Sequence, residues 1–178
     1  AEELVLSAVS DRGLDAIILR PTALIGPPDE QPSRFGRTIL DLYTGKLPMI
    51  SSGGYDLLDI RDFSQTVINS LEKAQKGEVF VTGGKFYSLK ELAEAVNPSR
   101  IPPVISIDLL LVLLPLIRLY QKFVPLRWPI NRESLMAIKQ GPNRVDSTKA
   151  AEQLSHQFRP LQESVRDLIA WMKKNDKL

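Results

Sequence analysis

The sequence offers few side chains for nucleophilic or metal chemistry. It contains no cysteine and one histidine, His156. Thiolate metal sites, disulfides and histidine-based metal clusters are therefore excluded. A Ser-His-Asp triad would have to use His156, which follows a short predicted helix and precedes Gln157 and Phe158. We interpret this histidine as a surface or helix-end residue, and we predict neither a metal site nor a catalytic side chain in this chain.

A binding site is predicted where the first strand ends. The apolar run from Leu14 to Leu19 is typical of a strand covered on both faces, as in a parallel sheet. Arg20-Pro21 then ends the strand, and Gly26-Pro27-Pro28 turns the chain away. Ligands of open α/β sheets bind at the carboxyl ends of strands, so the loop from Pro21 to Gly26 is the first candidate site. The alternative is an ordinary exit from a strand.

Length and composition set the class of protein. The 178 residues suffice for one domain, or for a core with a small appended lobe, and the formal net charge is +2. No basic run or interleaved basic and aromatic pattern suggests nucleic acid as a partner. The absence of cysteine fits a reducing compartment, and no secretory signal is visible, so we expect a cytoplasmic location. The first helix has neither a starting methionine nor a cap, which indicates a piece of a longer chain.

Helices and strands are predicted to alternate, which favours an α/β fold. Capping residues fix most helix starts: Asp62, Asp108, Asn131 and Asp146 or Ser147 are predicted N-caps, and Ser88 with Glu91 forms a capping box. In chain order we predict a helix to Arg12 stopped by Gly13, the strand Leu14–Leu19, a helix from Pro32-Ser33 to Gly45, and the strands Lys46–Ile50 and Tyr55–Ile60. A helix with Phe63, Val67, Ile68 and Leu71 on one face comes next, followed by the strand Glu78–Thr82. Each later cap begins a helix, and a last helix is predicted from Leu161 to Met172.

One helix is unusually apolar. Its run from Leu109 to Ile117 has nine residues, well short of the ~20 that cross a bilayer. We predict a buried helix kinked at Pro115 in preference to an amphipathic helix lying on a membrane surface. A membrane partner is therefore not expected.

Taken in order, several motifs resemble the second half of the extended short-chain dehydrogenase/reductase superfamily, which contains NAD-dependent epimerases and dehydratases. The spacing around Pro32-Ser33 and Gly45 to Pro48 resembles most closely the dihydroflavonol reductase-like branch. The motifs are Ala1-Glu2-Glu3-Leu4 with Gly13-Leu14, Arg20-Pro21-Thr22 with Ile25-Gly26-Pro27, Leu58-Asp59-Ile60-Arg61-Asp62, Gly77-Glu78-Val79-Phe80 with Gly83-Gly84, and Ser88-Leu89.

The resemblance implies a partial Rossmann-type parallel sheet, containing the last strands only, plus a smaller and largely helical substrate-binding lobe. Residues 1–26 would end the dinucleotide-binding core, 27–76 would begin the substrate lobe, 77–97 would add the last core strand and helix, and 98–178 would complete the lobe. The glycine-rich turn and the Tyr-x-x-x-Lys motif of the family are missing, so this chain alone would lack the family's acid/base group.

The resemblance also implies particular ligand contacts. Pro21, Thr22, Ala23 and Leu24 would meet the nicotinamide end of an NAD or NADP cofactor in the complete protein. Ser33 would approach the cofactor phosphates or simply cap its helix. Tyr55 and Arg37 would face a small-molecule substrate. Tyr55 stands where an arginine commonly grips the diphosphate of nucleotide sugars, which argues for a less charged substrate.

Two functions of different classes follow. In the first, the chain is the substrate-binding half of an NAD(P)-dependent oxidoreductase, epimerase or dehydratase acting on a hydroxyl or carbonyl group. In the second, it is a non-enzymatic binding or assembly module of the same fold. The strand Leu14–Leu19 would lack its upstream neighbour, so a missing N-terminal half or another subunit is an expected partner. For the pair Arg61-Asp62, a helix cap with an exposed neighbour is preferred to a substrate clamp.

Overall fold

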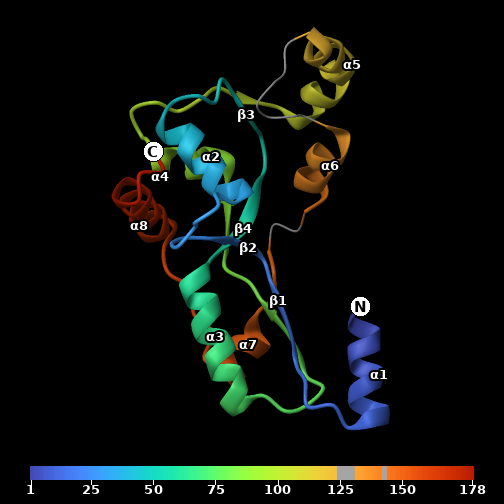
Figure 1. Cartoon of the computed structure of the whole chain (residues 1–178). Coiled ribbons are helices and arrows are strands. Elements are labelled where there is room, and N and C mark those ends of the chain that lie inside the picture. The colour runs from blue at the N-terminus through green and yellow to red at the C-terminus, as the bar shows by residue number, and fades with distance from the viewer. Residues whose placement is uncertain (124–130, 142–143) are drawn as a thin grey trace.

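A computed structural model describes residues 1–123, 131–141 and 144–178, and the side chains of Arg118 and of residues 120–123 are left undescribed. The described residues form a mixed α/β fold, as predicted (Figure 1). The helices are α1 (Glu2–Arg12), α2 (Arg34–Tyr43), α3 (Ile60–Lys73), α4 (Leu89–Val96), α5 (Ile107–Phe123), α6 (Arg132–Gln140), α7 (Thr148–Leu154) and α8 (Leu161–Lys174). The strands are β1 (Ile18–Pro21), β2 (Ala23–Ile25), β3 (Ile50–Ser51), β4 (Gly54–Asp59), β5 (Val79–Thr82), β6 (Lys85–Ser88) and β7 (Val104–Ile105).

The strands form three small sheets. Strand β1 pairs in parallel with β5, and Ile18 lies opposite Val79. Strand β2 pairs in parallel with β4, whose other edge pairs antiparallel with β6. Strands β3 and β7 form a short parallel pair. Parallel pairing of strands far apart in the sequence requires helical crossovers, and α2 and α3 provide them.

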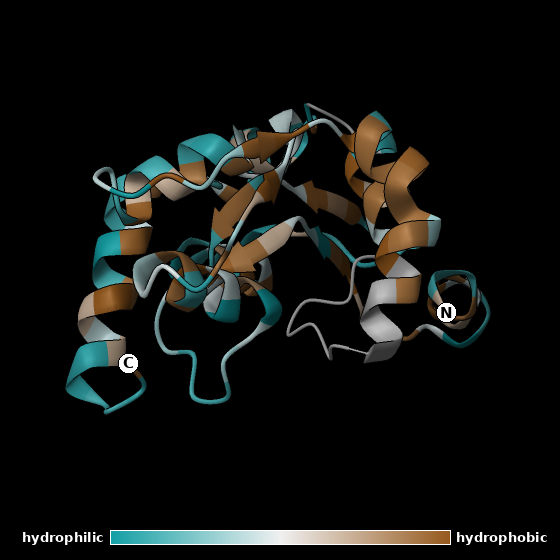
Figure 2. Cartoon of the chain, turned by 90° about the horizontal axis from the view of Figure 1, so that it is seen from above, coloured by the Kyte–Doolittle hydropathy of each residue, from teal (hydrophilic) through white to brown (hydrophobic). Residues whose placement is uncertain are grey.

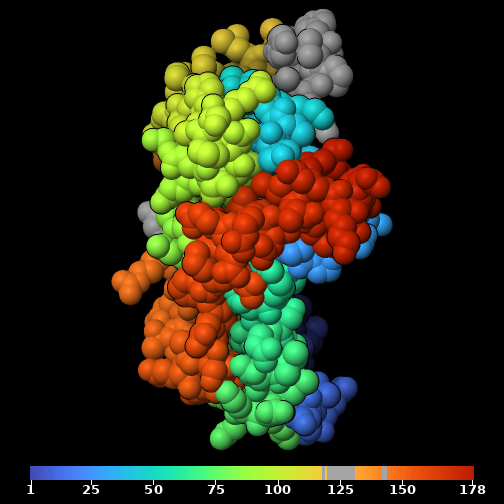
Figure 3. Space-filling model, turned by 90° about the vertical axis from the view of Figure 1, so that its left-hand side faces the viewer, coloured from blue at the N-terminus to red at the C-terminus, as the bar shows by residue number. Residues whose placement is uncertain are grey.

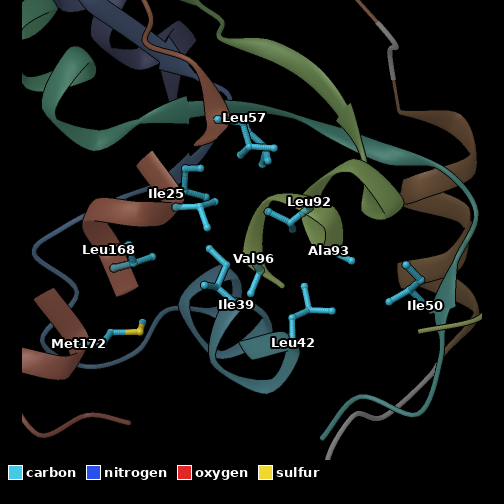
Figure 4. Packing of buried hydrophobic residues seen from close by; sticks show 12 residues of the cluster. Ile25, Ile39, Leu42, Ile50, Leu57, Leu92, Ala93, Val96, Leu168 and Met172 are labelled. Carbon is cyan, nitrogen blue, oxygen red and sulfur yellow. The ribbon is translucent and has the colours of Figure 1, made fainter. Parts of the chain in front are cut away.

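The largest core lies between the sheet β2-β4-β6 and helices α2, α4 and α8 (Figure 4). Each helix presents an apolar stripe to the sheet, which is what a helix with hydrophobic residues at three- and four-residue spacing must do. Fully buried members include Ile39 of α2, Leu92 of α4 and Leu168 of α8. A smaller cluster places Phe80 of β5 against Ala150 and Leu154 of α7.

Helix α8 joins these two regions. Figure 3 shows the C-terminal segment crossing one face of the molecule, with α2 and α4 on one side and α3 and α7 on the other. Arg61 of α3 binds Asp167 of α8 at 2.9 Å, and Arg159, just before α8, binds Asp62 of α3 at 2.7 Å. These ion pairs fix the end of β4 and the start of α3 to the last helix.

Helices α5 and α6 form a separate lobe with a core of its own. Ile107, Leu110 and Leu114 of α5 are buried together with Leu135 of α6. The opposite face of α5 is exposed, so the prediction of a fully buried helix is wrong for half of its surface. A helix that is apolar all round needs cover on every side, and α6 covers only one.

Most predicted elements are present, with shifted bounds. Gly13 ends α1 in the left-handed conformation, and the capping box at Ser88 and Glu91 is complete. Asn131 caps α6, and the Oδ1 of Asp146 accepts from the Thr148 amide at the start of α7. The strand β6 was not predicted, and the strand expected at Lys46–Ile50 is reduced to Ile50–Ser51.

Several local predictions are wrong. The first strand is Ile18–Pro21 and not Leu14–Leu19, and its residues are half-buried or exposed instead of covered on both faces. Asp59 caps α3 in place of Asp62, because the helix begins at Ile60 and Asp62 therefore lies inside its first turn, where it binds Arg159. Helix α5 begins at Ile107, one residue before the predicted cap.

Apolar residues of α3 are misplaced in the prediction too. Ile68 and Leu71 are exposed, while the small polar residues Thr66 and Ser70 face the interior. Thr66 and Ser70 can be buried because their hydroxyls donate back to carbonyl oxygens of their own helix. No described helix is long and apolar enough to cross a membrane.

Candidate functional site

The chain passes from one sheet to another at Thr22. The residue before it, Pro21, pairs with Thr82 of β5, and the residue after it, Ala23, pairs with Leu57 of β4. The Thr22 amide donates to the carbonyl oxygen of Thr82 at 3.2 Å, so the crossing is held at its centre. The predicted loop from Pro21 to Gly26 is therefore mostly strand, and its backbone donors and acceptors are largely used in pairing.

A pocket of about 170 Å³ opens at this crossing. Four segments line it: the junction of β1 and β2, the start of β4, the C-terminal part of α6 and the residue Val145. The lining residues are Thr22, Ala23, Gly54, Tyr55, Asp56, Ala137, Gly141 and Val145. The structure thus brings Thr22 and Ala23, predicted from the sequence to meet a cofactor, next to Tyr55, predicted to face a substrate.

Tyr55 is half-buried and packed against an aromatic neighbour. Its ring meets that of Phe35 of α2 edge to face, with centroids 5.0 Å apart. Burial raises the pKa of the Tyr55 phenol, and the nearby Arg34 opposes this in part. The hydroxyl is therefore protonated at neutral pH and can donate a hydrogen bond to a neutral or anionic acceptor.

Asp56 places a carboxylate in the same wall. One of its oxygens accepts from the Gly84 amide at 2.7 Å, so the carboxylate orients the Gly83-Gly84 turn. The residue is 9% exposed. The sequence analysis did not select Asp56, because the segment Tyr55–Ile60 indicated a strand and nothing more; its place beside Tyr55 was a signal that could have found it.

Thr22 has an unused hydroxyl. Its Oγ1 is buried and has no hydrogen-bond partner among the described residues, and the same holds for Thr82 Oγ1. Buried polar groups are paired in most proteins, and an unpaired one costs about 1–3 kcal/mol. Thr22 is one of the residues that line the pocket, but its Oγ1 has almost no solvent-accessible surface, so a bound molecule would meet this hydroxyl only after the side chain turned toward the pocket.

The remaining predicted site residues lie outside this pocket's lining. Leu24 pairs within the sheet with Leu58. The Ser33 hydroxyl accepts from the Gly36 amide at 3.0 Å, which is a standard helix cap, and it also donates to Asp29. Arg37 is exposed and donates to the carbonyl oxygen of Pro32. Pro21 is exposed at the end of β1.

A larger hollow of about 410 Å³ lies elsewhere, between the end of α2 and the segment before β7. Its lining contains three prolines together with Lys46 and Arg100, and none of the predicted site residues. We regard the smaller pocket as the candidate site, because it combines three polar side chains of different chemistry with an apolar surround.

His156 lies just after the end of α7, which is one of the two positions predicted, but it is buried and not on the surface. Its Nε2 lies 2.7 Å from the Gly83 carbonyl oxygen and its Nδ1 lies 2.8 Å from Thr66 Oγ1. His156 and Asp56 thus both hold the Gly83-Gly84 turn, His156 through the Gly83 carbonyl oxygen and Asp56 through the Gly84 amide. Among the described residues no group of three or more histidine, aspartate or glutamate side chains is arranged to hold a metal ion.

Arg61 is engaged inside the protein. Its guanidinium binds Asp59 and Asp167, at 2.7 and 2.9 Å. Burial raises the pKa of Asp59, but hydrogen bonds from Arg61 and Ser164 outweigh it and hold the pKa below the usual range. The ionised pair is a structural element of the α3–α8 junction.

Comparison with known proteins decides which fold this is. The structure of the protein gox2253 matches with a TM-score of 0.82 and 25% identity, over 100% of this chain and 55% of that one. A nucleoside-diphosphate-sugar epimerase from Pseudomonas aeruginosa matches with a TM-score of 0.77 and 20% identity, over 99% of this chain and 54% of that one. The chain has the fold of the C-terminal half of an NAD-dependent epimerase or dehydratase.

Other matches agree with this epimerase/dehydratase fold. A UDP-glucuronic acid 4-epimerase from Bacillus cereus, solved with UDP-glucuronic acid and NAD, matches with a TM-score of 0.67 and 17% identity, over 98% of this chain and 50% of that one. No family model matches the chain.

Two curated relatives are similar in sequence. Sterol demethylase protein B of Methylococcus capsulatus is 30% identical over 181 residues, which cover 97% of this chain and 53% of the relative. A putative dihydroflavonol 4-reductase of Synechocystis is 33% identical over 89 residues, covering 50% of this chain and 25% of the relative. The chain spans about half or less of the length of these relatives, and the predicted resemblance to the dihydroflavonol reductase-like branch is confirmed.

Proposed function

We propose that this chain is the substrate-binding half of an NAD(P)-dependent oxidoreductase that acts on a hydroxyl or carbonyl carbon of an uncharged, largely apolar molecule. The observation that carries the proposal is the pocket at the β1–β2 crossing, where Thr22, Tyr55 and Asp56 meet within an apolar surround. The division into core residues 1–26 and 77–97 and lobe residues 27–76 and 98–178 is part of the same proposal.

The charge of the pocket supports a neutral substrate. Asp56 contributes a carboxylate and Tyr55 a hydroxyl, and none of the described residues that line the pocket is cationic, although the cation Arg34 lies near Tyr55. A sugar diphosphate needs arginine or lysine donors, and beside Asp56 it would meet repulsion instead. The relative named for sterol demethylation supports the same choice, because a sterol is an apolar molecule with a hydroxyl or carbonyl group.

The cofactor assignment rests on the fold and on one property of the site. Pro21 to Leu24 lie along the crossing, and the Thr22 hydroxyl there has no partner among the described residues and could bond to a ligand amide or hydroxyl if its side chain turned into the pocket. NAD or NADP would supply hydride transfer. Ser33 remains a candidate for the phosphate end, although its hydroxyl already caps α2.

A second candidate, an assembly module, is favoured by the edge of β1. Among the described residues β1 pairs only with β5, so its other edge is open to a further strand. An N-terminal half of the same protein or a separate subunit would both satisfy this edge. The two candidates differ in whether the assembled protein turns over a nicotinamide cofactor.

The test uses the complete protein that contains this chain. It is mixed with NAD or NADP and with a 3-hydroxysteroid, and with a UDP-sugar in a parallel series, while nicotinamide absorbance is followed. We expect turnover with the steroid only. The variant Tyr55→Phe should raise KM about tenfold, the equivalent of one hydrogen bond of about 1.4 kcal/mol, while Tyr43→Phe on α2 should leave it unchanged. Conversion of the UDP-sugar alone, followed by its product because an epimerase or dehydratase returns the hydride and leaves no net change in nicotinamide absorbance, would overturn the substrate class. A complete protein that binds no cofactor and converts neither substrate would favour the assembly module.

A further inference from the structure

The larger hollow, of about 410 Å³, has two cationic residues in its lining and no acidic one among the described residues there. Lys46 follows the end of α2, and Arg100 ends the turn after α4. The volume lies in the range of small-molecule sites, about 300–1,000 Å³. Figure 2 views the molecule from the end that carries this hollow. None of the lining residues belongs to the candidate pocket, so the two sites are separate.

The backbone holds both walls of the hollow in place. The Ile50 amide, at the start of β3, donates to the carbonyl oxygen of Pro103 at 3.0 Å, and β3 pairs in parallel with β7. The Arg100 amide donates to the carbonyl oxygen of Asn97 at 3.1 Å. Three prolines stand in the lining, and each fixes its own backbone angle φ. A ligand would therefore meet walls that are already formed.

The guanidinium of Arg100 has a fixed place in this hollow. It lies against Gly45, where a Cβ atom would overlap it, and Gly45 has a φ of +67°, which favours glycine. Neither the Arg100 guanidinium nor the Lys46 ammonium has a hydrogen-bond or ion-pair partner among the described residues. The carboxylate of Asp41 in α2 is buried and does not line the hollow. The two cations are therefore available to a bound anion.

The lining also determines the size and chemistry of that anion. A phosphate monoester carries a charge of about −1.5 to −2 at neutral pH, which two cations match. The planar fork of an arginine binds phosphate oxygens through two parallel hydrogen bonds. A bare phosphate ion would leave most of the volume empty, whereas Leu47, Ile101 and the prolines offer apolar surface to an organic group.

We propose that this hollow binds a small organic phosphate monoester. Arg100 and Lys46 bind the phosphate, and the apolar wall receives the organic group. The competing role for the two cations is structural: α2 ends at Tyr43, and cations near a helix C-terminus offset its partial negative charge. The inference goes beyond the proposed function and can be tested without nicotinamide cofactor or alcohol.

The experiment is isothermal titration calorimetry of the full chain with phenyl phosphate, and with inorganic phosphate, benzoate and phenol in parallel. We expect phenyl phosphate to bind most tightly, with an affinity that falls as salt is added. Arg100→Gln and Lys46→Gln should each weaken its binding about tenfold or more, because each removes a charge-assisted hydrogen bond. Arg100→Lys keeps the charge without the planar fork and should lose less than Arg100→Gln.

The matched control is Arg12→Gln. Arg12 is an exposed arginine at the end of α1, which Figure 1 places at the opposite end of the molecule from β3. We expect Arg12→Gln to bind phenyl phosphate as the wild type does. Circular dichroism with a thermal melt checks that the variants fold, and Lys46→Gln carries the test if Arg100→Gln does not.

Four results would overturn the proposal. The first is no binding of phenyl phosphate. The second is an equal loss of affinity in Arg12→Gln and in the variants of the hollow. The third is equal or tighter binding of inorganic phosphate, benzoate or phenol. The fourth is a lowered melting temperature in Arg100→Gln with unchanged affinity for phenyl phosphate, because the cation would then serve only the end of α2.

Discussion

The buried ring of His156 donates from Nε2 to the carbonyl oxygen of Gly83, 2.7 Å away. A carbonyl oxygen can only accept, so this contact fixes the proton on Nε2. The bond joins the segment after α7 to the turn after β5. Asp56 accepts from the next amide, that of Gly84, so two side chains from different parts of the sequence hold the turn.

Replacing His156 by leucine should therefore destabilise the fold by about 2 kcal/mol or more. Leucine retains most of the volume but leaves the Gly83 carbonyl oxygen buried without its donor. His156→Ala should cost more, because it adds a cavity. Urea denaturation followed by circular dichroism measures both. An exposed neighbour, Phe158→Ala, serves as the control. Equal free energies of unfolding for wild type and His156→Leu would contradict this role.

The ion pair between Asp62 and Arg159 should contribute more to the free energy of unfolding than an ion pair between exposed side chains. Asp62 accepts from both the backbone amide and the guanidinium of Arg159, at 2.8 and 2.7 Å. In Asp62→Ala the partly buried cation loses its shortest partner and keeps only the longer contacts with Asp59 at 3.8 Å and Glu163 at 3.3 Å, with an expected cost of about 1–2 kcal/mol. Glu94→Ala breaks an exposed pair with Lys90 and should cost less than about 0.5 kcal/mol. A similar cost for the two variants in the same denaturation assay would refute the structural role.

Stability should fall in acid partly through Asp59. Its pKa is lowered in the folded protein: burial raises it, but hydrogen bonds from Arg61 and Ser164 outweigh burial. A lowered folded pKa contributes stability that is fully present above the unfolded value of about 3.9 and is lost as the pH falls through the folded value.

The matched variant for this effect is Asp59→Asn, which can still cap α3 but carries no charge. Between about pH 5 and pH 2 its free energy of unfolding should fall less steeply than that of the wild type. Chemical denaturation at a series of pH values gives the two slopes. If the free energies of unfolding of the wild type and of Asp59→Asn change equally with pH, Asp59 does not contribute to the loss of stability in acid.

Ser33 was left open by the sequence between a helix cap and a phosphate contact. In the structure the Ser33 hydroxyl accepts a hydrogen bond from the Gly36 amide and so caps α2. Ser33→Ala removes this cap and should lower the free energy of unfolding by about 1 kcal/mol. Ser33→Asn should restore it, because asparagine caps as well as serine. If Ser33→Ala leaves the unfolding free energy unchanged, the cap is unimportant. Cofactor affinity of the complete protein, measured in the same two variants, tests the phosphate contact separately.

The helices were predictable where local chemistry decides them. The capping box at Ser88 and the left-handed Gly13 both depend on residues a few positions apart, and both are present. The bounds of β1 were not predictable, because they depend on pairing with β5 some sixty residues later. The burial of His156 likewise depends on Thr66 and Gly83, which only the tertiary fold brings near.

The candidate site was predictable in part. Thr22, Ala23 and Tyr55 were selected from the sequence and line one pocket, although their binding roles remain predictions. Asp56 was missed because its neighbours in the sequence suggested a strand and nothing more. The α5 prediction failed on its outer face, since composition gives the number of apolar residues but not how many neighbours cover them.

The most direct test of the central claim is nicotinamide turnover by the complete protein that contains this chain, with a neutral alicyclic alcohol as substrate. Reduction of NAD or NADP that depends on the alcohol, and that Tyr55→Phe weakens through KM, is the result expected. A complete protein that binds no nicotinamide cofactor at all would contradict the account.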